Sequence, residues 1–125
     1  MSIQNMQTGN FVNPKTNYFA APQQLDAQGQ IIGHSHFVIQ AISSFTDTTV
    51  PDPEKFAFFQ GVNAPANNGV LTINVAKGLP AGFYRILSIN TAANHQPALV
   101  PVAQHGAMDD GIYVSRPTCG SCARA

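Results

Sequence analysis

The sequence predicts an all-β domain, an antiparallel, β-sandwich-like arrangement of about six to seven short strands. Two observations lead to this fold class. Short apolar segments rich in β-branched and aromatic residues alternate with turns rich in Gly, Pro, Asn and Asp. In addition, no segment shows the sustained 3.6-residue apolar period of an amphipathic helix, and no capping box precedes an apolar run.

The longest expected strand covers residues 31–42 and carries apolar residues on both of its faces. Such a strand is typical of a buried, central position in a sheet. It contains His34 and His36, and residues two apart on a strand point to the same face. We therefore expect the two imidazoles to point into packed material or a closed pocket.

Shorter strands are expected before and after this central one. Residues 70–75 and 83–89 are predicted to form a hairpin across a glycine-rich connection. The apolar segment 98–103 contains Pro101, which cannot donate to a ladder, so it is predicted to be an edge or bulged strand. The remaining expected strands are one within 1–12, a brief extended piece at 18–20, and strands at 54–62 and 112–114.

The composition restricts the partners that this chain can have. Charged residues make up 10% of its 125 residues, and six basic side chains cancel six acidic ones. Binding to nucleic acid needs clustered Lys and Arg, as does a polybasic membrane anchor, so neither partner is expected. No apolar run approaches the ~20 residues of a membrane helix. Residues 1–10 lack the features of a signal peptide, so the chain alone is expected to be non-secreted or to lack its leader.

The four histidines are the main candidates for a functional site: His34, His36, His95 and His105. Zinc and copper are commonly bound by three or four neutral imidazole nitrogens. His95 and His105 lie roughly 30 Å apart if the chain between them is fully extended. His95 and His105 can both bind one ion only if the chain between them folds back. We therefore expect a metal site formed by His34, His36 and one of these two histidines. Asp109 or Asp110 could add an oxygen ligand.

The same residues also have a structural interpretation, in which buried histidines hydrogen-bond loop backbone. The sequence assigns no catalytic residue. Glu54, the only glutamate, has no evident link to the histidines, and Ser35 points away from its neighbours on a strand. A non-enzymatic role is therefore favoured.

Recognition of cell-wall polysaccharide is the second candidate function. Aromatic rings could stack on sugar faces while amides bind hydroxyl groups, although these residues could equally be core and turn residues. The side chains considered are Tyr18, Phe19, Asn63, Asn67, Asn68, Tyr84, Asn90, Asn94, Gln96 and Tyr113.

The C-terminal end is predicted to be separate from the β domain. We expect the domain to cover residues 1–114 and a flexible tail to cover 115–125, which contains Cys119-x-x-Cys122. A four-thiolate zinc site is excluded because the sequence has no second cysteine pair.

A series of motifs carries a resemblance to a known group of proteins. They are Thr8-Gly9-Asn10-Phe11-Val12-Asn13, Asn17-Tyr18-Phe19, Gly33-His34-Ser35-His36, Phe56-Ala57-Phe58-Phe59, Gly78-Leu79-Pro80-Ala81-Gly82, the stretch from Ser88 to Pro97, and Pro101-Val102-Ala103-Gln104-His105-Gly106. The chain resembles the C-terminal part of a group of secreted fungal proteins, mainly from basidiomycetes, many of which carry a mistaken ribosomal-protein label. The group has no established activity.

The resemblance implies further expectations. It implies an extracellular location, and it covers about residues 3–114, so that 115–125 falls outside it. The similar proteins are longer and have an additional N-terminal region that supplies more strands. A sandwich without those strands would expose a sheet edge, through which we expect a homodimer to form.

Overall fold

The computed structural model describes residues 1–20, 22–100 and 102–118. It is nearly all β, as predicted. Within these described residues the strands are β1 (Met6–Gln7), β2 (Ile31–Ile42), β3 (Phe58–Val62), β4 (Gly82–Ala92) and β5 (Gly111–Arg116), and one short helix, α1 (Pro14–Asn17), is present. None of the described helical residues forms an apolar helix of membrane-spanning length.

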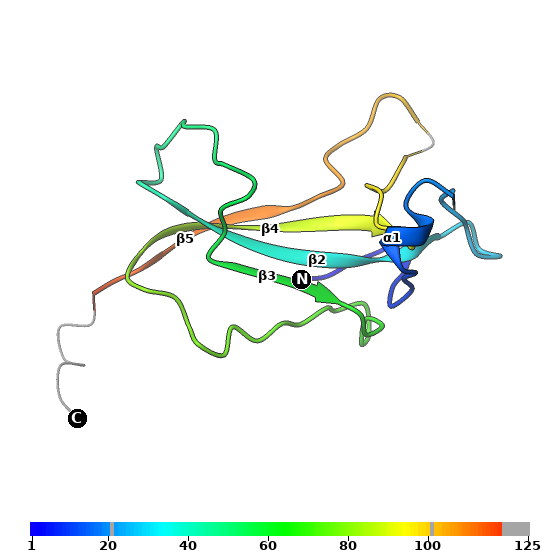
Figure 1. The fold of residues 1–125 in the computed structure, drawn as a ribbon, viewed down its shortest axis with the longest axis horizontal. Helices are drawn as coiled ribbons and strands as arrows, with labels where there is room; N and C mark the ends of the chain where they lie inside the picture. Colours follow the sequence, from blue (N-terminus) through cyan, green and yellow to red (C-terminus); the bar gives the residue numbers. More distant parts are fainter. Residues whose placement is uncertain (21, 101, 119–125) are drawn as a thin grey trace.

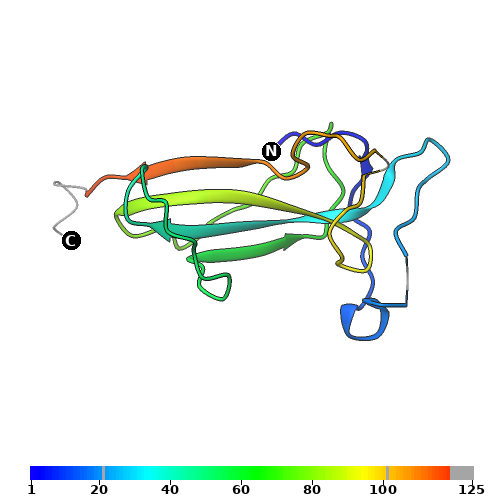
Figure 2. The same cartoon turned by 90° about the horizontal axis from the view of Figure 1, so that it is seen from above.

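The strands form one mixed, five-stranded sheet around β2 (Figures 1 and 2). β4 lies antiparallel along one side of β2, and β5 is antiparallel to β4. On the other side of β2, β1 pairs in parallel with Ile31 and Ile32, and β3 pairs antiparallel with residues 35–39. The central position predicted for residues 31–42 is therefore confirmed. The sandwich-like arrangement is not confirmed, because the described strands make a single sheet.

Alternation along β2 separates the apolar core from the histidines. Phe37, Val62 and Leu71 form a buried cluster. Phe37 and Val62 lie on the face of Ser35, whereas His34 and His36 lie on the opposite face because side chains alternate along a strand. The core face is covered by residues that pack on the cluster from the N-terminus and from the connection between β3 and β4: Met1, Ile3, Ala66 and Ile73.

The predicted hairpin of 70–75 with 83–89 is wrong. β4 pairs with β2 and β5, and both of its sides are thereby occupied. Residues 70 and 71 instead bond to a local turn and to the N-terminus: Val70 N donates to Asn67 O, and Leu71 N donates to Met1 O, both at 2.9 Å. Leu71 is still buried in the core, so its apolar character reflects burial outside a strand.

Other boundaries also differ from the prediction. Asn13-Pro14 begins α1, where no helix was predicted: the Asn13 side chain accepts a hydrogen bond from Lys15 N, and proline suits the first helical position. The extended piece predicted at 18–20 is wrong, because these residues form a turn that directly follows α1. No strand forms in the described part of 98–103, where Ala98 N donates to Asn90 O. Pro101 lies outside the described residues.

The last strand is longer than predicted. β5 begins at Gly111 and ends at Arg116, whereas the strand was expected at 112–114. The division into a domain at 1–114 and a tail at 115–125 stays a prediction. Cys119 and Cys122 lie outside the described residues, and their role stays a prediction.

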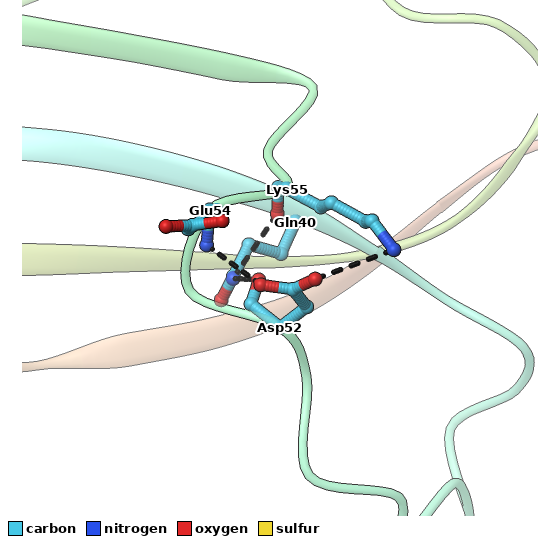
Figure 3. A network of polar contacts seen from close by, with 4 residues as sticks. All are labelled: Gln40, Asp52, Glu54 and Lys55. Atoms are coloured by element: carbon cyan, nitrogen blue, oxygen red, sulfur yellow. Dashed lines mark hydrogen bonds and ion pairs between the residues drawn. The ribbon is translucent and has the colours of Figure 1, made fainter.

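Gln40 attaches the loop after β2 to the sheet (Figure 3). Its buried Nε2 donates to Asp52 O at 3.2 Å and to Lys55 O at 3.3 Å. Its Oε1 accepts from Arg85 Nη2 at 2.6 Å. In the same turn Glu54 N donates to Asp52 Oδ1, and Lys55 forms an exposed ion pair with Asp52. Exposed ion pairs contribute little, so we attribute the attachment of this turn mainly to Gln40.

We expect Gln40→Ala to lower the free energy of unfolding by about 2 kcal/mol, because it leaves two carbonyl groups and a guanidinium without their partner. Chemical denaturation measures the change. Gln60→Ala, in the exposed part of β3, is the matched control, and it should stay within about 0.5 kcal/mol of wild type. Equal effects of the two substitutions would contradict this role of Gln40.

Candidate metal centre

Three of the four histidines come together at one end of the sheet. β2 supplies His34 and His36, and the loop after β4 supplies His95. Ring nitrogens of the three lie within 4.8 Å of one another. The ring centroids are 4.4 Å apart for His34 and His95, 4.7 Å for His34 and His36, and 5.6 Å for His36 and His95. We call these three residues the histidine triad.

His34 is fully buried, and its neighbours determine its tautomer. Its Nδ1 lies 3.0 Å from Asn10 O, and a carbonyl oxygen can only accept, so Nδ1 carries the proton. Nε2 therefore keeps its lone pair. The Thr91 hydroxyl, directly across on β4, donates to His34 O at 3.2 Å and lies 3.3 Å from Nε2. A backbone carbonyl that orients the ring in this way is the usual outer partner of a metal-binding histidine.

His36 is held between strands by an aromatic ring and a glycine. Its ring stacks on Phe59 of β3, with centroids 5.3 Å apart. Gly61 lies opposite His36 in the ladder, and a Cβ atom there would approach His36 Cδ2 to 3.0 Å. The space for this imidazole therefore depends on the glycine at position 61.

His95 occupies a tight turn that directs it back over the sheet. Its φ of 72° lies in the left-handed region, which is uncommon for a residue other than glycine, and its N–H donates to Ala92 O at 3.0 Å. The turn is attached to the segment after α1, because Asn94 Nδ2 and Gln96 Nε2 both donate to Tyr18 O. Among the described residues, His95 Nδ1 is buried and has no hydrogen-bond partner.

The surroundings keep the two β2 imidazoles neutral. Burial, together with nearby His36 and His95, lowers the pKa of His34 to about 4, against a smaller opposing effect of the hydrogen bond to Asn10. Burial and His95 also lower the pKa of His36. Neutral imidazole is the form that binds a metal ion, so these nitrogens are available as ligands near pH 7.

We expect the stability of the metal-free protein to fall as the pH falls from about 6.5 to about 4. In this window the unfolded chain binds a proton at His34 that the folded chain does not, which favours unfolding by up to roughly 3 kcal/mol. Denaturation between pH 7 and pH 4 measures the change. His34→Asn lacks the titrating ring, so its stability should vary less, and an unchanged pH dependence in this variant would contradict the prediction.

The other predicted ligands lie elsewhere. His105 is exposed, is not a member of the triad, and its Nδ1 donates to Gly106 O at 2.6 Å. Asp109 Oδ1 accepts from Asn90 N at 2.7 Å, and Asp110 Oδ1 accepts from Gly111 N at 2.9 Å. Neither aspartate joins the triad. The histidine pair is therefore completed by His95, which is one of the two combinations predicted.

Residues considered for sugar binding take different places. Tyr84 is 4% exposed and donates to Pro80 O, which places it in the core. Phe19 and Tyr113 are exposed, at 94% and 58%.

The sequence did not predict the neighbours of the triad, namely Asn10, Phe59, Gly61 and Thr91. Only the parity of His34 and His36 could be seen in the sequence, because the partners depend on strand register.

A family model described as the CLU5d N-terminal domain matches residues 1–116. The chain belongs to this family. The expected resemblance to fungal proteins is confirmed in part, because a relative of this chain comes from a fungus. The expected placement in the C-terminal part of longer proteins is not confirmed, because the matching family is described as an N-terminal domain.

One relative of this chain is "Pathogenicity cluster 5 protein d" of Colletotrichum graminicola, which is 44% identical over 112 residues. The alignment covers 88% of this CLU5d-type chain and 23% of that protein, so the chain spans about a quarter of its length. No solved structure matches the chain.

Proposed function

We propose that His34, His36 and His95 bind one zinc or copper ion. The observation that carries this proposal is the buried Nδ1 of His95, which has no partner among the described residues and lies near the other ring nitrogens. A buried polar atom without a partner costs free energy, and a metal ion would satisfy it. The lowered pKa values of His34 and His36 favour the neutral form that metal binding requires.

The ligand set limits the chemistry. Three imidazoles suit zinc or copper and leave a coordination position open. The triad includes no carboxylate or thiolate of the described residues. Hydrolysis would need a general base beside the ion, so we propose a metal-binding role without a catalytic step. The name of the fungal relative associates that protein with pathogenicity, and we propose the same biological context for metal binding by this chain.

Metal analysis of protein purified without a histidine tag tests the proposal. After incubation with zinc or copper and removal of the excess, we expect about one ion per chain, as one three-histidine site predicts. His34→Ala with His36→Ala should abolish this binding while circular dichroism shows a folded sheet. Metal-free wild-type protein, or equal metal content in the double variant, would refute the proposal.

An alternative function is binding to cell-wall polysaccharide, favoured by the exposed Phe19 and its edge-to-face contact with Tyr18. Exposed aromatic rings commonly stack on sugars. Retention on chitin or β-glucan that is lost in Phe19→Ala would support it. We also propose an extracellular location and a homodimer. Detection in culture filtrate tests the location, and sedimentation tests the homodimer.

A further inference from the structure

A concave surface lies on the face of the sheet opposite the histidine triad. It is a cavity of about 770 Å³ between the N-terminal segment, residues 23–31, and the loops before β5. Ser88 and Asn90 of β4 line it, and they pair with Phe37 and Ser35, whose side chains point away from the face of His34. The volume is within the usual range of small-molecule sites.

The lining of this cavity is apolar and adaptable. All three methionines of the chain, Met1, Met6 and Met108, line it. Methionine side chains are flexible and adjust to ligands of irregular shape. Leu25 and Leu99 also line it and are 57% and 65% exposed. Apolar side chains exposed within a concave surface indicate that something apolar binds there. We call this surface the methionine cavity.

The charge of the lining selects the ligand's head group. Among the described lining residues the charged side chains are Asp109 and Asp110, and none is Lys or Arg. The positive group on a lining residue is the N-terminal ammonium of Met1, which donates to Leu71 O at 2.9 Å, so the two carboxylates outnumber it. Both aspartates are exposed, and the hydrogen bonds described above use one oxygen of each carboxylate. We propose that the methionine cavity binds a small amphipathic cation, with its alkyl chain among the methionines and leucines and its head group near the two carboxylates.

Displacement of a neutral fluorescent probe, N-phenyl-1-naphthylamine, tests this inference on the whole chain. We expect saturable probe binding and displacement by decyltrimethylammonium about tenfold more effectively than by decanoate, a difference of about 1.4 kcal/mol from the nearby carboxylates. Asp109→Asn with Asp110→Asn keeps both acceptor oxygens and should remove most of that preference.

Two further variants separate the cavity from general surface binding. Leu25→Ser with Leu99→Ser should weaken probe binding, and both positions are exposed, so folding should be retained. Val50→Ser, at an 89% exposed position outside the cavity, should leave probe binding unchanged. Lack of probe binding, equal displacement by the two detergents, or equal effects of the Leu and Val variants would overturn the inference. So would a dimer in sedimentation whose formation displaces the probe, because a second copy would then be the occupant.

Discussion

His95→Ala is expected to weaken zinc or copper binding by more than about 100-fold, because it removes one of three ligands, whereas removal of an outer partner alone typically costs 10- to 100-fold. His95 lies in a loop that is attached to the rest of the protein through Asn94 and Gln96, so the substitution should leave the sheet intact. Competition with a chromophoric chelator measures the affinity.

His105→Ala is the matched control. It removes the same side chain from an exposed position outside the triad, and we expect an unchanged affinity. Similar losses in both variants would mean that the histidines bind metal without a defined site. No loss in either variant would exclude His95 as a ligand and leave only the pair on β2.

Gly33→Ala is expected to lower the free energy of unfolding by roughly 3 kcal/mol, since overpacking against backbone cannot be relieved by a rotamer change. A Cβ atom at position 33 would lie 2.0 Å from Thr91 O and 3.1 Å from Ala92 Cα. The strands β2 and β4 would have to separate at the end of the sheet that carries the triad. Chemical denaturation measures this change.

Gly106→Ala is the control for this prediction. A Cβ atom there has open space within 4 Å, and its φ is not in the left-handed region. We expect a change within about 0.5 kcal/mol. A Gly33→Ala protein as stable as wild type would show that β2 and β4 can move apart at this position at little cost.

The pairing of β2 with its neighbours explains which parts of the fold could be predicted. Residues 31–42 are apolar on both faces, and this local pattern predicted the central strand. Residues 70–75 have an equally good local pattern but form no strand, because β3 and β4 already occupy the two sides of β2. Strand propensity is local, whereas the choice among competing partners depends on the whole chain.

The N-terminal segment explains what was missed at the site. Asn10 O binds His34, Val12 N donates to Ala93 O at 2.8 Å, and Tyr18 O accepts from the two amides beside His95. These contacts join residues more than twenty positions apart in sequence. No residue type or spacing in the sequence predicts these contacts, because a backbone carbonyl is the acceptor in each of them.

The local residue pattern was enough to predict that the protein is β-rich and that His34 and His36 share one face, because the alternation of side chains along a strand is a property of the local backbone. The choice of His95 and not His105 as their neighbour could be seen only in the folded chain. That choice depends on the left-handed turn at His95 and on its hydrogen bonds to the segment after α1, which form only when distant parts of the chain meet.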